Sequence, residues 1–256
     1  MAPGTAETAA DSRYARLRRL NLVVGVVFVV QVVVIAALSN NLSFPISVAY
    51  LGSDPIAAQV PATPHVVFRI GVGLAIAIFL ACAAVDHLLT GGPLRRWYER
   101  QLDRRANYAR WIEYTFSSSV MIVLITTLVG VRDLAAVLGV IAANSAMILF
   151  GLLMERQQTP GRTDWSAFWF GSVVGLVPWV LVVIYIAGAP RVPGFVYVIT
   201  LVQFLLFFSF AANMALQYLQ VGRWKDYVYG EYGYILLSLA AKTLLAWLIF
   251  GNVLRA

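Results

Sequence analysis

The chain has 256 residues, of which 61% are hydrophobic and only 12% are charged, a composition typical of integral membrane proteins rather than of water-soluble enzymes. Its formal net charge of +7 does not indicate nucleic-acid binding, because the basic residues lie in short segments between apolar runs. The single cysteine, Cys82, excludes an intramolecular disulfide, and two histidines without a Cys/His cluster argue against a metal site.

The N-terminal segment, 1–19, is polar, and we expect a tail without regular structure up to about Ser12. Four arginines near its end precede an apolar run from Leu22 to Leu38 that only Gln31 interrupts. This run is too long for the apolar part of a secretory signal, and no clear cleavage site follows it. We therefore interpret it as a retained first membrane helix.

A helix that crosses the hydrocarbon core of a bilayer needs about 20 mainly apolar residues. Counting at that length predicts seven such helices and no internal repeat. The expected fold is therefore an all-α membrane protein, a seven-helix bundle over residues 20–256. The predicted spans are 20–39, 66–90, 108–130, 134–154, 165–187, 195–220 and 231–254.

The long connection between the first two spans, 40–65, carries its own structural signal. β-branched and aromatic residues from Ser43 to Leu51 precede the turn sequence Gly52-Ser-Asp-Pro. This pattern favours a short strand or β-hairpin over one end of the bundle, with an irregular cap as the alternative.

The basic residues predict the orientation of the bundle. Thirteen of the 19 fall in the tail and in the 91–107, 155–164 and 221–230 loops, whereas the opposite side has only Arg69, Arg132, Arg191 and Arg255. By the positive-inside rule, the N-terminus is cytoplasmic, and the C-terminus and the 40–65 loop are extracellular.

The last predicted span contains Lys242, with roughly ten apolar residues on either side. A charged side chain at mid-span costs about 2.5–3.5 kcal/mol on insertion scales, so its presence indicates a function. A desolvated lysine amine is a nucleophile that can form a Schiff base, whereas snorkelling to the interface or pairing with a structural carboxylate is the alternative. Ser238 lies one turn earlier on the same face, where its hydroxyl could bond either this site or its own helix backbone.

The third predicted span places Arg110, Glu113 and Ser117 on one helical face. Glu113 either neutralises Arg110 or serves as the anion beside a charged Lys242. The other acids near the spans are closer to helix ends, where we expect them to be solvated: Asp86, Asp133, Glu155 and Glu231.

Several further side chains are candidates for the surroundings of Lys242. His87, at the end of the second span, is a candidate for proton exchange, and Asn144 and Met147 share a face of the fourth span. The fifth and sixth spans are rich in aromatic residues that either form the walls of a site or fill the core and the lipid-facing surface. These are Trp165, Trp169, Trp179, Phe204, Phe207, Phe208 and Phe210.

This constellation resembles the heliorhodopsin family over essentially the whole chain. The third span carries Arg110-Trp111-x-Glu113-Tyr114 followed by Ser117-Ser118-Ser119 and Met121, and the seventh carries Ser238-x-x-x-Lys242. The cytoplasmic N-terminus agrees with the inverted topology of that family. The resemblance is weaker in the sixth span, where Phe210 and Gln217 are the best matches.

The resemblance implies all-trans retinal attached to Lys242 as a Schiff base, with Glu113 as its counterion. It also implies photoisomerisation to 13-cis, a slow photocycle and a homodimer. The further pocket positions that it implies are Ser117, Ser118, Met121, Asn144, Met147, Trp169, Phe210, Gln217 and Ser238. A cytoplasmic proton and hydrogen-bond network would comprise His87, Asn107, Arg110, Tyr114 and Glu155.

One position departs from the family, whose members often have a histidine in the first span. This chain has Gln31 there, which leaves His87 as the candidate proton acceptor.

The expected function is that of a photosensor in the cell membrane, surrounded by lipid, that is not an enzyme and moves no net ion. The basic 91–107 loop and the 221–230 segment either dock a soluble cytoplasmic partner or anchor helix ends at the lipid headgroups. A light-driven proton pump or channel is the first alternative, and it requires titratable groups on both sides of Lys242. A light-independent transporter or enzyme that uses Lys242 is the second, and it would stay colourless with retinal.

Overall fold

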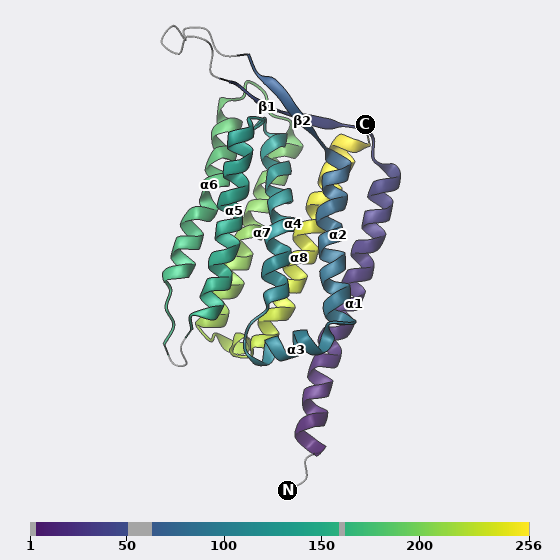
Figure 1. Cartoon of the computed structure of the whole chain (residues 1–256), viewed down its shortest axis with the longest axis vertical. Coiled ribbons are helices and arrows are strands. Elements are labelled where there is room, and N and C mark those ends of the chain that lie inside the picture. The colour runs from purple at the N-terminus through teal and green to yellow at the C-terminus, as the bar shows by residue number, and fades with distance from the viewer. Residues whose placement is uncertain (1–3, 51–62, 159–161, 256) are drawn as a thin grey trace.

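Seven long helices form an antiparallel bundle in the computed structural model, which describes residues 4–50, 63–158 and 162–255 (Figure 1). Each is long and apolar enough to cross a bilayer, so the chain is a multi-pass membrane protein. They are α1 (Gly4–Leu38), α2 (Val72–Gly91), α4 (Tyr108–Leu128), α5 (Leu134–Arg156), α6 (Ser166–Gly188), α7 (Gly194–Tyr218) and α8 (Tyr227–Ile249). A π-helical turn, η2 (Phe250–Leu254), continues α8.

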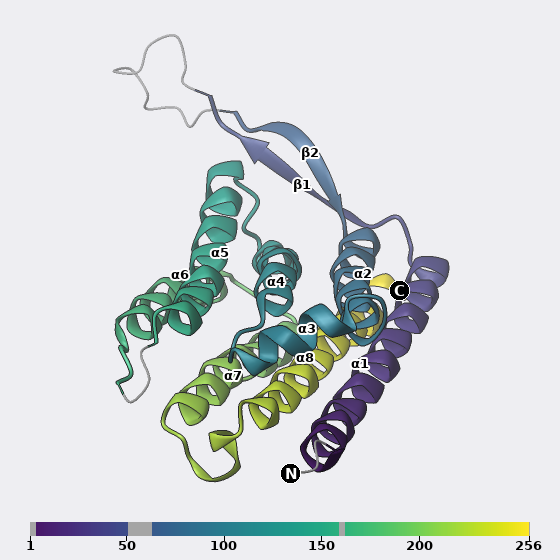
Figure 2. The same ribbon diagram turned by 60° about the horizontal axis from the view of Figure 1, so that its bottom comes forward.

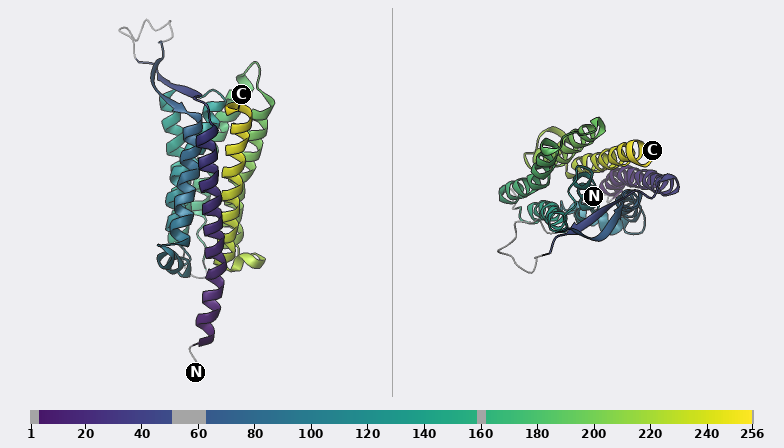
Figure 3. Two further views of the ribbon diagram at one scale, coloured as in Figure 1. Left: turned by 90° about the vertical axis from the view of Figure 1, so that its right-hand side faces the viewer. Right: turned by 90° about the horizontal axis from the view of Figure 1, so that it is seen from above.

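Helix α1 is longer than its membrane span. It begins at Gly4, and its first turns project beyond the rest of the bundle (Figures 1 and 3). Its apolar, spanning part is Tyr14–Leu38. The expectation of an irregular tail up to Ser12 is therefore wrong from Gly4 onward, because the alanine-rich sequence before the arginines has high helix propensity and continues the helix.

A two-stranded antiparallel sheet lies across one end of the bundle, here called the sheet end (Figures 1 and 2). Strand β1 (Ser43–Val48) falls within the predicted strand, and it pairs with β2 (His65–Gly71) from Ser43↔Gly71 to Val48↔His65. A hydrogen bond from Ser47 N to Arg132 O, 2.9 Å long, attaches the sheet to the loop before α5. The predicted turn at Gly52 lies outside the described residues.

Strand β2 corrects the predicted start of the second span. Residues 66–71 were assigned to a helix on their apolar character, but they pair with β1, and α2 begins only at Val72. The run Val66-Val67-Phe68 is both apolar and rich in β-forming residues, so hydropathy alone does not distinguish a strand from a helix there.

A short helix, α3 (Arg95–Asp103), lies across the opposite end, here called the α3 end (Figure 2). Tyr98 and Leu102 face the protein, while Arg96 and Arg100 are exposed. A 3₁₀ turn, η1 (Gly222–Lys225), connects α7 to α8 at the same end. The sequence prediction treated the α3 residues as a loop, because their apolar face is only two side chains wide.

The most buried of the spans is α4, which packs between α2 and α5. The hydroxyl of Tyr114 on α4 donates a 3.1 Å hydrogen bond to the carbonyl of Tyr234 on α8, which joins these two helices in the interior. The two helices that carry the predicted site residues therefore face each other across the core.

Candidate functional site

Lys242 and Glu113 form an ion pair in the interior of the bundle. Lys242 is 3% exposed, and its Nζ donates hydrogen bonds to Glu113 Oε2 at 3.2 Å and to Ser238 Oγ at 2.8 Å. The same Nζ lies 4.9 Å from the centre of the Tyr114 ring, whose face is attractive to a cation. The buried lysine therefore has an anion, a hydroxyl and an aromatic face as partners.

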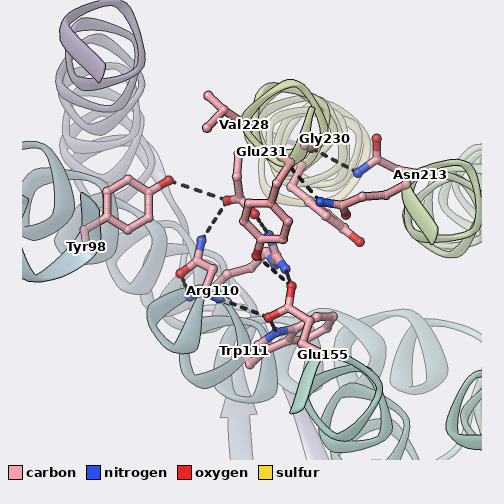
Figure 4. Close-up of polar contacts among 12 residues, drawn as sticks. Tyr98, Arg110, Trp111, Glu155, Asn213, Val228, Gly230 and Glu231 are labelled. Atoms are coloured by element: carbon pink, nitrogen blue, oxygen red, sulfur yellow. Dashed lines mark hydrogen bonds and ion pairs between the residues drawn. The ribbon is translucent and has the colours of Figure 1, made fainter. Parts of the chain in front are cut away.

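Arg110 pairs with two other carboxylates rather than with Glu113. Its guanidinium forms ion pairs with Glu155 of α5 and Glu231 of α8, and it stacks on the Tyr234 ring with its Cζ 3.8 Å from the ring centre (Figure 4). Of the two alternatives for Glu113, the structure therefore shows the pair with Lys242. The choice follows from helix packing, because Glu155 and Glu231 bind the two terminal amino groups of Arg110.

The Arg110 cluster extends over α4, α5 and α8 at the α3 end. Trp111 Nε1 donates to Glu155 Oε2 at 2.7 Å, and Tyr227 donates its hydroxyl proton to Glu155 Oε1 at 2.8 Å. Asn107 caps α4 and donates from Nδ2 to Glu231 Oε2 at 2.8 Å (Figure 4). The solvated positions expected for Glu155 and Glu231 are therefore wrong: each side chain is 1% exposed, because Arg110 draws both into the bundle.

Replacing Arg110 with glutamine should strongly destabilise the protein, because it leaves two buried carboxylates without their cation. Removing one partner of a buried ion pair lowers the free energy of unfolding by about 3–5 kcal/mol. Unfolding in detergent, followed by circular dichroism, measures this loss. The matched control is Arg100→Gln on the exposed face of α3, for which we expect a change within about 0.5 kcal/mol. Equal losses in the two variants would contradict a structural role for the cluster.

A cavity extends from Lys242 between α4, α5, α6, α7 and α8. Its walls are mainly aromatic and aliphatic, with Ser118, Ser172 and Ser238 as the hydroxyl side chains. The remaining lining residues are Trp111, Tyr114, Met121, Met147, Ile148, Gly151, Ala167, Phe168, Gly171, Gly175, Trp179, Phe207, Phe208, Phe210, Ala211, Met214, Tyr234 and Ala241. The cavity is thus a largely apolar space with one amine in its wall.

Two glycines allow their neighbours to approach closely at this cavity. A Cβ at Gly175 would lie 2.3 Å from Met147 Sδ, and one at Gly151 would lie 2.3 Å from the Trp111 ring. Any larger residue would therefore displace a side chain that lines the cavity.

Most predicted pocket positions lie at this cavity. Lys242, Ser238, Ser118, Met121, Met147 and Phe210 line it, as do Trp179, Phe207 and Phe208. Asn144 lies behind the wall, where its Nδ2 donates to Ser118 Oγ at 2.7 Å and to Ser119 Oγ at 3.0 Å. Glu113 and Ser117 are buried beside Lys242 but are not part of the lining.

Two of the predicted pocket residues lie elsewhere. Trp169 is 63% exposed on the outer surface, and its neighbour Phe168 lines the cavity instead, because each residue turns an α-helix by about 100°. Gln217 lies near the α7–α8 connection, where its Nε2 donates to the Tyr227 carbonyl at 3.4 Å. Of the other predicted wall residues, Trp165 and Phe204 do not line the cavity either.

The sequence prediction also missed cavity residues, notably Trp111 and Tyr234. Tyr234 lies four residues before Ser238 and eight before Lys242, so helical spacing alone would have placed it on the same face. Trp111 lies three residues before Tyr114 and seven before Ser118, so the same spacing would have placed it on their face, and the gap at Gly151 leaves room for its ring.

His87 is buried rather than interfacial. Its Nδ1 is 2.7 Å from Asn21 Oδ1, and its ring stacks on Phe28 with the ring centres 5.8 Å apart. Gln31 is also buried: it donates to Thr243 Oγ1 and accepts from Trp247 Nε1, each at 3.1 Å, and so joins α1 to α8.

Solved structures of two cyanorhodopsins and of a light-driven proton pump have the same fold as this chain. Cyanorhodopsin from Tolypothrix sp. NIES-4075 superposes with a TM-score of 0.61 at 16% identity over 93% of this chain and 94% of that one. A light-driven proton pump from Leptosphaeria maculans gives 0.59 at 14% identity over 92% and 93%, and cyanorhodopsin from Calothrix sp. NIES-2098 gives 0.56 at 15% over 70% and 75%. At these identities the likeness shows the fold alone.

No curated protein sequence matches the chain. The model of the heliorhodopsin family, however, matches residues 17–254, which include all seven spans, the Lys242–Glu113 pair and the Arg110 cluster. The chain therefore belongs to the heliorhodopsin family.

Proposed function

We propose that the protein is a light-sensing photoreceptor that signals or regulates without net ion transport, rather than an enzyme. The observation that carries this proposal is the buried Lys242–Glu113 pair at the wall of an aromatic cavity. Family membership implies a retinal chromophore, and the residues present fit one. The lysine supplies an amine for covalent attachment, and the mainly apolar walls suit a hydrophobic polyene.

All-trans retinal, held at Lys242 as a protonated Schiff base, would supply absorption of visible light, isomerisation to 13-cis and a slow photocycle. The protein residues hold and tune that charge. Glu113 and Ser238 accept hydrogen bonds from Lys242 Nζ and would stabilise a positive charge on that nitrogen. Ser118, fixed by Asn144, places a hydroxyl dipole in the cavity wall. Trp179 and Phe207 pack edge to face at 5.4 Å and restrict the space for motion.

The distribution of titratable groups supports a role without transport. In the described spans, the Asp, Glu and His side chains other than Glu113 lie toward the α3 end of Lys242. Toward the sheet end the polar interior residues are neutral, among them Gln31, Thr126 and Gln203. A relay built of Asp, Glu and His needs such side chains on both sides of Lys242, and the described spans supply them on one.

Illumination of sealed vesicles tests the absence of transport. We expect that illumination causes no uncoupler-sensitive change in the pH of the external medium. Such a change would instead support the alternative, a light-driven proton pump or channel. A protein that remains colourless after addition of retinal would support a light-independent transporter or enzyme that uses Lys242.

We also propose that the protein lies in the cell membrane as a homodimer, with the N-terminus and the α3 end in the cytoplasm. The basic residues gathered at the α3 end support this orientation, and they offer a docking surface for a soluble cytoplasmic signalling partner.

A pair of adjacent aromatic residues tests whether the cavity holds the chromophore. Phe168→Ala should shift the absorption maximum, because it removes a ring from the cavity wall, whereas Trp169→Ala should leave the spectrum unchanged. Absorption spectra of the two purified variants with retinal make the comparison. A shift in Trp169→Ala alone would contradict the assignment of this cavity.

A further inference from the structure

The charged groups in the interior of the described bundle do not balance, since the other cations of the spans are exposed: Arg16, Arg18, Arg19 and Arg156. Glu113 pairs with Lys242, and Glu155 and Glu231 share the single cation of Arg110. Asp86 on α2 is a fourth carboxyl, and no ion pair joins it to any residue in the described part of the chain. Two cations thus face four carboxyl groups. Since unpaired charge is costly in a membrane interior, at least one of these carboxyls should carry a proton, and Asp86 is the one without a cation.

Asp86 lines a small polar cavity at the α3 end, which is large enough for a water molecule. The other lining residues are Asn21, His87, Thr90, Tyr98, Asn107, Arg110, Tyr114, Glu231, Tyr234 and Ile235. Tyr114 and Tyr234 also line the large cavity beside Lys242, so the two cavities share a wall. The side chains of Tyr114 and Tyr234 therefore lie between the cavity that Asp86 lines and the cavity that Lys242 lines.

Unpartnered polar atoms lie on α4 and α8, the two helices that carry the Lys242–Glu113 pair. Glu113 Oε1, Ser117 Oγ and Tyr234 OH are buried without a hydrogen-bond partner among the described residues. Burying such an atom is unfavourable unless water satisfies it. Bridging water along these atoms would connect the carboxyl to the ion pair.

We propose that Asp86 is an internal proton donor, which holds a proton in the resting protein and returns one to Lys242 Nζ after that atom has lost its own. Glu113, which accepts a hydrogen bond from Nζ at 3.2 Å, takes up the proton that Nζ loses. The transfer from Asp86 then leaves Asp86 as a carboxylate and restores the positive charge on Nζ, and the proton on Glu113 passes to Asp86 to restore the resting state. This inference rests on the proposed function. His87 is less suited, because Asn21 occupies its Nδ1 and Phe28 covers its ring.

Other ionisable groups face Asp86 and must be kept intact in a test. They are Cys82 and His87 on α2, Tyr98 on α3, Arg110, Glu113 and Tyr114 on α4, and Glu231, Tyr234 and Lys242 on α8, while α1 contributes the neutral Asn21. The replacement Asp86→Asn keeps the size of the side chain and all of these groups.

Infrared spectroscopy of the protein without retinal tests the resting state. The wild type should show a carbonyl stretch of a protonated carboxylic acid that moves in heavy water, and Asp86→Asn should lose one component of it. The matched control is Asp164→Asn. Asp164 is exposed, and hydrogen bonds from Ser166 lower its pKa, so it is ionised at neutral pH and its replacement should leave the band intact. An unchanged band in Asp86→Asn would overturn the proposal.

Flash spectroscopy with retinal tests the transfer. Asp86→Asn should still form colour but return the proton to the Lys242 nitrogen about 100-fold more slowly, the size of effect typical of a positioned acid. Asp86→Glu should restore most of the rate. A coloured Asp86→Asn variant with the wild-type rate would overturn this inference alone, whereas a colourless wild type would refute the proposed function.

Discussion

Replacing Lys242 with alanine should abolish visible absorption after addition of all-trans retinal. The chain has only two lysines, and Lys242 is the one that lines the aromatic cavity. Without its amine, covalent attachment there is lost completely rather than weakened. Absorption spectra of the purified variant, recorded before and after incubation with retinal, measure the effect.

The second lysine provides a matched control. Lys225 lies in the exposed turn η1 at the α3 end, away from the cavity lining, so Lys225→Ala should form the same colour as the wild type. Colour that is retained in Lys242→Ala and lost in Lys225→Ala would show that retinal attaches at Lys225, and it would refute the assignment of Lys242. Because Lys242→Ala also leaves Glu113 without a cation, the double variant Lys242→Ala/Glu113→Gln shows whether misfolding causes the loss.

Replacing Glu113 with glutamine should shift the absorption maximum to longer wavelength. At 3.2 Å the carboxylate attracts the charge on Lys242 by about 5 kcal/mol at an effective dielectric constant of about 20. This attraction localises positive charge at the nitrogen, and its removal lets the charge spread along the polyene. Spectra of wild type and Glu113→Gln, taken at the same acid pH to keep the nitrogen protonated, measure the shift.

The control for this prediction is Glu99→Gln on α3, where the carboxylate pairs with Arg95 at the surface rather than with Lys242. Its spectrum should match that of the wild type, and Glu113→Asp should shift less than Glu113→Gln. An unchanged maximum in Glu113→Gln would show that another anion serves Lys242. Asp86 would then be the first candidate, since Glu155 and Glu231 are held by Arg110.

The separation of the two cationic centres explains why both are stable. Arg110 lies at the α3 end with two carboxylates, Tyr234 and Trp111 around it, whereas Lys242 has one carboxylate and borders the cavity. The arginine, through its two ion pairs, holds α4, α5 and α8 together. The lysine, with a single anion and space beside it, is the group whose charge can change without breaking that cluster.

Sequence reasoning located the spans and the chemistry but not the ends of the elements. Runs of about 20 apolar residues are a strong signal, because lipid excludes unpaired backbone groups, and all seven predicted spans correspond to helices. Residues 66–71 were misassigned, since a strand that pairs with a distant segment leaves the same apolar signal as a helix. The helix α3 was not predicted because it has only nine residues, and its buried side chains, Tyr98 and Leu102, are too few to give a clear apolar pattern.

The sequence by itself determined that Lys242 is a charge in a membrane span and that Glu113 is the deepest carboxyl available to it, because burial of charge in lipid is too costly to be accidental. Only the tertiary structure decided which cation Glu113 serves, that Phe168 rather than Trp169 lines the cavity, and that Asp86 faces a polar cavity without an ion pair of its own. Helical spacing fixes which residues share a face. The rotation of each helix about its axis, set by packing against its neighbours, decides what that face meets.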